Sequence, residues 1–218
     1  MHTRNFRYLH VKKTVLKFLD FYIKSSIHVA LAVVSLASIS LSLSQYELSV
    51  SMLIFIFCIA LFAYNFIKFF PVIWNIRNHG FSYVIFFLSL MCLLLSLYLF
   101  IQLTILSKII VVTGGILVLL YTFPLNKDLN NLRNTKGWKV YLVVLTWILI
   151  TVCLPFLSNT IFEIRLFIQL VLIQGIYIYV AILPFDIRDL DSDSPCLNTI
   201  PQKLGVSKSK TFNYFFII

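Results

Sequence analysis

Long apolar stretches alternate with short polar segments along almost the whole chain. Each stretch holds about 20 residues, which is the number that a helix rising about 1.5 Å per residue needs to cross a hydrocarbon core of about 30 Å. We therefore predict six transmembrane helices, at residues 27–45, 49–70, 82–103, 106–123, 139–157 and 166–185. A seventh apolar run opens near Thr211, and the sequence ends inside this run at Ile218.

The residues before the first apolar stretch have a different pattern. Between Val11 and Lys24, apolar side chains recur at helical spacing among lysines, which predicts an amphipathic helix lying on the membrane surface. The positive N-terminus lacks the short apolar core and small-residue cleavage site of a signal peptide, so we expect the first span to be retained. The pattern divides the chain into an N-terminal segment, 1–26, and a membrane-embedded domain, 27–218.

Composition supports the same class of protein. The chain has 218 residues, of which 60% are hydrophobic and 12% are charged. A soluble chain of this size does not supply enough dry partner surface to bury several consecutive apolar windows of this length. We therefore expect an all-α, polytopic transmembrane helical bundle, surrounded by the lipid bilayer of the cell or inner membrane.

The positive charges are distributed unevenly along the chain, whose net charge is +10. If the N-terminus is cytoplasmic, all of the 18 lysines and arginines except Lys108 and Arg165 fall in cytoplasmic segments. This asymmetry follows the positive-inside rule, so the basicity indicates topology rather than nucleic-acid binding. It predicts that the N-terminus and the longer loops, including one acidic loop after the sixth span, are cytoplasmic.

That acidic loop carries the densest cluster of candidate functional side chains. Four of the eight acidic residues lie between Asp186 and Asp193, and on a continuous helix Asp186, Asp189 and Asp193 fall within roughly 60° of one face. Three carboxylates on one face repel each other unless a cation lies among them. Magnesium is usually held by one or two carboxylates together with substrate phosphates, which favours Mg2+ and a diphosphate substrate. The alternative is a solvated acidic cap on a helix end.

The sequence that starts at Asp186, DIRDLDSDSPCLNTIPQKLG, resembles the second aspartate-rich motif of the UbiA family of intramembrane prenyltransferases. With the helix order, the resemblance covers nearly the whole chain. It implies an all-helical fold in which two aspartate-rich cytoplasmic loops hold magnesium and a prenyl diphosphate above a lipid-facing tunnel. It also implies that Asp186, Asp189 and Asp193 are catalytic magnesium ligands, and that Arg188 or Lys203 neutralises diphosphate oxygens.

The first aspartate-rich motif of the family is degenerate in this sequence. Its pattern N-D-x-x-D-x-x-x-D aligns with YNFIKFFPVI, where Asn65 is kept and Phe66, Phe69 and Ile73 stand at the aspartate positions. Lys68 lies nearby, and we hypothesise that it contacts the diphosphate in place of a magnesium ion. Asn65 is a second diphosphate-binding candidate on this segment.

Two further features bear on the resemblance. Tyr121-Thr-Phe-Pro124 followed by Lys127 is similar to a less specific family segment, and adds Lys127 as a diphosphate-binding candidate; its alternative is a helix end with a basic anchor. The family typically has nine helices, whereas this sequence ends as the seventh begins. We therefore also consider a fragment or a truncated copy.

Three functions follow from these patterns. The first is a membrane prenyltransferase-like enzyme that uses Mg2+ to transfer an isoprenoid from its diphosphate to an aromatic or lipophilic acceptor. The second is a catalytically inactive relative that binds an isoprenoid or another membrane protein, and the degenerate first motif favours it. A small transporter is less favoured, because no predicted span carries a charge at its midplane or is visibly broken there.

Overall fold

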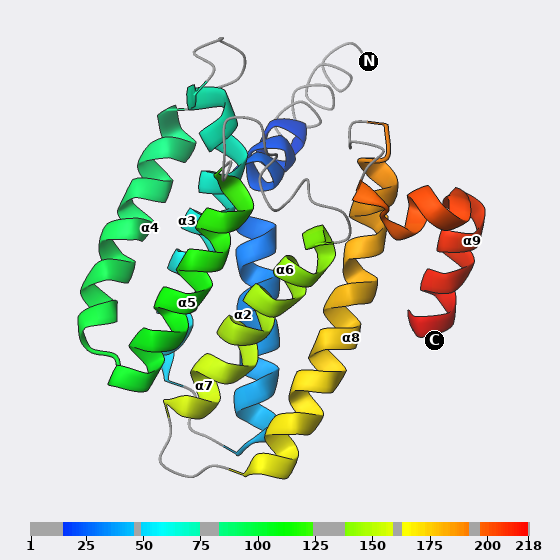
Figure 1. Ribbon diagram of the computed structural model, residues 1–218. Coiled ribbons are helices and arrows are strands. Elements are labelled where there is room, and N and C mark those ends of the chain that lie inside the picture. Colours follow the sequence, from blue (N-terminus) through cyan, green and yellow to red (C-terminus); the bar gives the residue numbers. More distant parts are fainter. Residues whose placement is uncertain are drawn as a thin grey trace, which may run out of the picture. The chain divides into compact units, whose positions relative to one another are not determined.

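The computed structural model describes residues 15–45, 49–74, 83–123, 138–158, 163–191 and 197–217 (Figure 1). These residues are helical apart from short turns, and no strand occurs among them, which confirms the predicted all-α class. The chain divides into two compact units. Unit 1 comprises Met1–Ser35 and Val50–Ile101, and unit 2 comprises Leu36–Ser49 and Gln102–Ile218.

Unit 1 contains the helix Val15–Lys24, the first part of α2 (Ile27–Leu43), α3 (Val50–Trp74) and α4 (Tyr83–Ile101). Helices α3 and α4 pack side by side along their lengths (Figure 1). Large apolar side chains of α3 form the centre of this unit and are almost fully buried; they are Phe55, Ile56 and Leu61. The predicted N-terminal helix is confirmed over Val15–Lys24, while residues 11–14 of that prediction lie outside the described ranges.

Unit 2 contains the second part of α2 and the helices that follow α4. They are α5 (Ile105–Thr122), α6 (Trp138–Ile148), η2 (Leu149–Cys153), α7 (Leu154–Leu157), α8 (Ile164–Arg188) and α9 (Ile200–Ile217). Val152 and Phe156 pack against Leu170 of α8 in the core of this unit. The Phe156 and Phe167 rings meet edge to face, with their centroids 5.5 Å apart.

Helices α6, η2 and α7 form one continuous run that is widened by a π-helical turn. The backbone N–H of Leu154 bonds to the carbonyl of Leu149, five residues earlier. Pro155 follows at once, and a proline ring inside a regular helix clashes with the carbonyl four residues before it, here that of Thr151. The wider turn accommodates this clash, so the span continues through the proline.

Among the described residues, five helices or helix runs are long and apolar enough to cross a membrane: Val50–Phe70, Tyr83–Ile101, Ile105–Thr122, Trp138–Leu157 and Ile164–Arg188. A sixth span is possible if Val15–Lys24 and Ile27–Leu43, which are bent by 63° relative to each other, are counted together. These five helices make the chain a multi-pass membrane protein. Helix α9 is not among them, so the seventh span stays a prediction.

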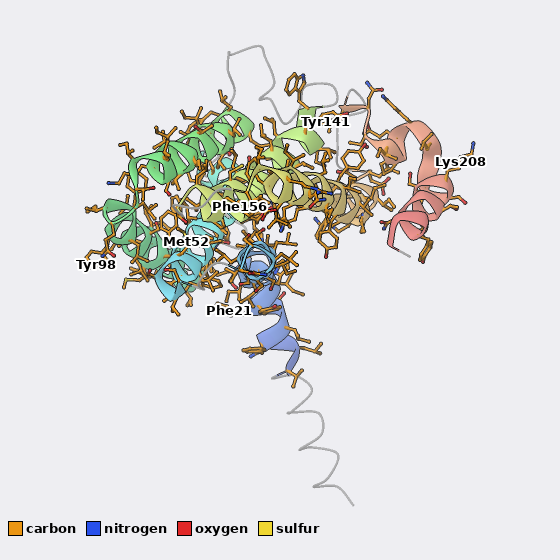
Figure 2. All side chains as sticks on the ribbon, turned by 90° about the horizontal axis from the view of Figure 1, so that it is seen from below. Phe21, Met52, Tyr98, Tyr141, Phe156 and Lys208 are labelled. Carbon is orange, nitrogen blue, oxygen red and sulfur yellow. The ribbon has the colours of Figure 1, made fainter. Side chains whose placement is uncertain are left out.

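Many large apolar side chains on these helices are exposed over a large part of their surface. Helix α4 is the clearest example, with Phe87, Met91 and Tyr98 each at least 60% exposed; Figure 2 labels Tyr98. In water such a surface would be costly, whereas a lipid-facing helix requires it. The exposed apolar surface therefore supports the membrane assignment independently of helix length.

Candidate functional site

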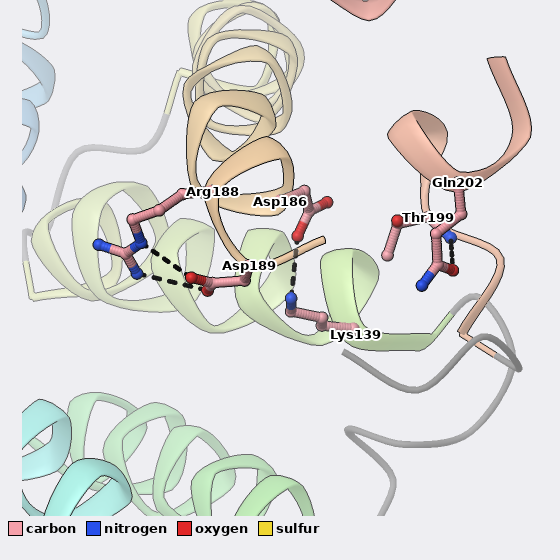
Figure 3. A network of polar contacts seen from close by, with 6 residues as sticks. All are labelled: Lys139, Asp186, Arg188, Asp189, Thr199 and Gln202. Atoms are coloured by element: carbon pink, nitrogen blue, oxygen red, sulfur yellow. Dashed lines mark hydrogen bonds and ion pairs between the residues drawn. The ribbon is translucent and has the colours of Figure 1, made fainter. Parts of the chain in front are cut away.

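An ion pair lies at the end of α8, where the acidic motif begins. The Lys139 Nζ of α6 is 3.0 Å from the Asp186 Oδ1 of α8, and both residues are more than 90% buried (Figure 3). The ammonium group on a neighbouring helix therefore compensates charge on the buried carboxylate of Asp186.

A second, more accessible ion pair follows within the motif. Arg188 donates from Nε to Asp189 Oδ1 at 2.8 Å and from Nη2 to Oδ2 at 3.3 Å, and the Asp189 side chain is 26% exposed. The Arg188 guanidinium also lies over the Phe185 ring, 5.4 Å from its centroid. Figure 3 shows this two-bond pair apart from the Lys139–Asp186 pair.

The prediction that Asp186, Asp189 and Asp193 share one helix face required a helix that continues through the motif, and α8 ends before Asp193. Helix α8 ends at Arg188, Asp189 is its C-cap with ψ near 4°, and residues 189–191 form a turn. The helical spacing therefore does not continue toward Asp193, which lies outside the described ranges. A helix end was hard to predict here because the motif contains neither glycine nor proline before Pro195.

Lys139 was missed as a site residue by sequence reasoning, which counted it only as a topology charge. The clustered carboxylates did indicate a nearby cation, and the structure supplies Lys139 and Arg188 in that role. A sequence signal for Lys139 existed. It begins the fifth predicted span and Asp186 follows the sixth, so two crossings bring the two residues to the same membrane surface.

The described residues contain no group of three or more His, Cys, Asp or Glu side chains placed to hold a metal ion. Asp186 is buried with Lys139, so Asp189 is the more accessible of the two carboxylates. One or two carboxylates with substrate phosphates are enough for magnesium, so Asp189 suits that ion chemically. The magnesium site stays a prediction, and it depends in part on Asp193.

The segment after the acidic motif starts α9 with one of the two hydrogen bonds of a capping box. The Thr199 backbone N–H donates to Gln202 Oε1 at 3.1 Å (Figure 3). The Lys203 N–H donates to the Thr199 carbonyl at 3.1 Å. The T-I-P-Q sequence therefore has a structural role at the start of α9. Gly205, with φ of +78°, then interrupts the helix in a conformation that glycine adopts without strain. Lys203 is exposed on the first turn.

The two candidates of the degenerate first motif lie in unit 1, where both make contacts within the bundle. Asn65 is 1% exposed and donates from Nδ2 to the Ser89 Oγ of α4 at 2.8 Å. Its Oδ1 has no hydrogen-bond partner among the residues described. Lys68 is exposed and donates to the backbone carbonyl of Lys24 at 2.9 Å. Lys127, the remaining candidate, lies outside the described ranges.

A polar network inside the spans of unit 2 was also missed. Gln174 of α8 donates from Nε2 to Ser40 Oγ at 2.7 Å and to the Leu36 carbonyl at 3.0 Å, and its Oε1 accepts from Thr151 Oγ1 at 2.7 Å. The network joins α2, η2 and α8. Both polar atoms of the Gln174 amide form hydrogen bonds to other helices, so this network stabilises helix packing.

Comparisons of the chain with protein-family models, with curated proteins and with solved structures gave no match. The likeness to the UbiA family therefore rests on the motif that starts at Asp186 and on the helix order.

Proposed function

We propose that this chain is a prenyltransferase-like membrane protein that transfers an isoprenoid from a prenyl diphosphate to an aromatic or lipophilic acceptor. One observation carries the proposal: carboxylate and guanidinium groups meet at the end of an apolar helix, within the segment that resembles the family motif. The side of the membrane that holds this site is proposed to be cytoplasmic, following the distribution of lysine and arginine.

The Arg188–Asp189 pair is the part of the site best suited to a diphosphate. A guanidinium fork binds two oxygens of a carboxylate and can bind two oxygens of a phosphate in the same geometry. A diphosphate can therefore replace Asp189 as the binding partner of Arg188. The carboxylate of Asp189 then becomes available to a metal ion. Both side chains are partly exposed, with 69% exposure for Arg188 and 26% for Asp189.

The residues of this site would act through charge. Magnesium, held by Asp189 with Asp193 and the substrate, would neutralise the diphosphate and so make it a better leaving group. Arg188 and Lys203 would bind the diphosphate oxygens, and Lys127 and Lys68 are further candidates for the same role. The apolar helices would shield the allylic cation from water until the acceptor attacks it.

A catalytically inactive, isoprenoid-binding relative is the second candidate, and a specific observation favours it. Asn65 and Lys68, the candidates from the first motif, are both used inside unit 1, one between α3 and α4 and the other on the Lys24 carbonyl. Asp186 is likewise engaged with Lys139. A protein that used these groups for packing alone would bind the isoprenoid chain without needing magnesium.

The test is binding of a non-hydrolysable prenyl diphosphate to the detergent-purified chain, with and without Mg2+. We expect saturable, magnesium-dependent binding that weakens at least tenfold in Asp189→Ala. The matched control is Asp191→Ala, which removes an exposed carboxylate from the same turn and should bind like the wild type. Magnesium-independent binding that survives Asp189→Ala would favour the inactive relative, and equal loss in both variants would refute a specific role for Asp189.

A further inference from the structure

The helix Val15–Lys24 leaves most of its apolar side chains uncovered. Val15, Leu16, Phe18, Leu19 and Ile23 are each 46–67% exposed. At about 100° per residue these side chains and that of Tyr22 occupy one continuous arc of about 160°. A helix of ten residues with such an uncovered arc needs an apolar partner to be stable.

The opposite side of the same helix is charged. Lys17, Asp20 and Lys24 occupy an arc of about 60°, and Lys24 pairs with Asp20 at 2.8 Å. Lys17 is exposed, and the first 24 residues carry six basic side chains against a single acidic one. A basic arc opposite an apolar arc is typical of helices that lie in the interface of an anionic membrane.

A polar elbow sets the direction of this helix. The axis of this helix is bent by 63° from the axis of α2, so the helix is closer to perpendicular than to parallel with α2. Ser25 and Ser26 at the elbow are buried, and Ser26 takes a positive φ of 61°. The Lys68 Nζ on the Lys24 carbonyl at 2.9 Å and the His28 ring on the Tyr22 carbonyl at 3.4 Å tie the helix end to its own unit.

We propose that the helix Val15–Lys24 is an interfacial anchor that inserts its apolar arc into the bilayer surface and selects anionic lipids through the basic residues around it. The bilayer is the occupant because the helix continues directly into α2, whose exposed side chains include Leu31, Ile39 and Leu43, so that one lipid phase covers both. Anionic headgroups complement the positive excess of the segment. Each basic residue near such a surface contributes roughly 1 kcal/mol, which is about fivefold in affinity.

The test uses quenching of tryptophan fluorescence by brominated lipids. Phe18→Trp places the probe on the apolar arc, at a side chain that is 67% exposed, and Lys17→Trp is the matched control on the charged arc. The full chain is reconstituted in bilayers of fixed phosphatidylcholine and phosphatidylglycerol content, with the bromine on the acyl chains of one lipid or of the other. The emission of the native tryptophans is subtracted using the parent chain under each condition.

We expect stronger quenching of Phe18→Trp than of Lys17→Trp, and stronger quenching when phosphatidylglycerol carries the bromine. Adding Lys12→Gln, Lys13→Gln and Lys17→Gln to Phe18→Trp should make the two brominated lipids equally effective. Equal quenching by both lipids before these changes would refute anionic selection. Failure of both lipids to quench Phe18→Trp would refute membrane insertion, and a concentration-dependent loss of quenching would assign the arc to a second copy of the chain.

Discussion

The ion pair between Lys139 and Asp186 gives the sharpest prediction, because both charges are buried. Breaking a buried pair leaves one charge without compensation, which typically costs about 3–5 kcal/mol of stability. Replacing both partners by apolar residues of similar volume is often neutral. We therefore expect Lys139→Met and Asp186→Leu to destabilise the protein separately, and the double variant to lie within about 1 kcal/mol of the wild type.

The size of the effect follows from the geometry. Two unit charges separated by 3.0 Å, the distance from Lys139 Nζ to Asp186 Oδ1, attract by about 5.5 kcal/mol at an effective dielectric constant of 20. The desolvation of the two groups offsets most of this attraction. Lysine has a long stem that reaches toward water, whereas aspartate does not. Lys139→Met should therefore cost about 3–5 kcal/mol and Asp186→Leu less, about 1–3 kcal/mol.

The assay is reversible unfolding of the purified chain by a denaturing detergent, followed by far-ultraviolet circular dichroism. The double-mutant cycle gives an interaction free energy that we expect to be at least about 2 kcal/mol. Lys208→Met on α9, labelled in Figure 2, is a control for removing an exposed lysine and should change stability by less than about 0.5 kcal/mol. Additive costs below about 1 kcal/mol for each single variant would show that the pair is neither buried nor coupled.

Three further predictions concern hydrogen bonds between or at the ends of helices. Gln174→Leu should cost about 1–3 kcal/mol of stability in the same unfolding assay, because it removes three hydrogen bonds. Gln169→Leu, which changes an exposed residue on the same helix, should be nearly neutral. Equal effects of the two substitutions would contradict the network. Ser89→Ala should destabilise the protein by about 0.6–1.7 kcal/mol, because Asn65 loses its hydrogen-bond acceptor on α4. Ser96→Ala should cost less, because the Ser96 hydroxyl bonds within its own helix. The reverse order would refute the bond between α3 and α4. Gln202→Ala should remove the side-chain bond to the Thr199 N–H and speed hydrogen exchange in the first turn of α9 about fivefold. Unchanged exchange would show that this bond does not stabilise the turn.

Sequence alone determined the positions of the helices. A span needs about 20 apolar residues, so each predicted stretch gave a helix whose ends lie within four residues of the predicted ones. The helix Val15–Lys24 was predicted for a related reason, since its apolar and basic residues alternate with helical period. Both signals are local in the chain, and they persist whatever the helices pack against.

Tertiary structure decided how the polar groups are used. Asp186 read as a metal ligand in the sequence, yet it is buried against Lys139, which is 47 residues away in the chain and on another helix. Gln174 gave no signal at all, because its partners Ser40 and Thr151 are common residues in distant segments. Hydrogen bonds and ion pairs depend on distances of about 3 Å, which are fixed only when helices pack. The apolar pattern therefore predicted the spans, and the packing of those spans determined the partner of each polar side chain.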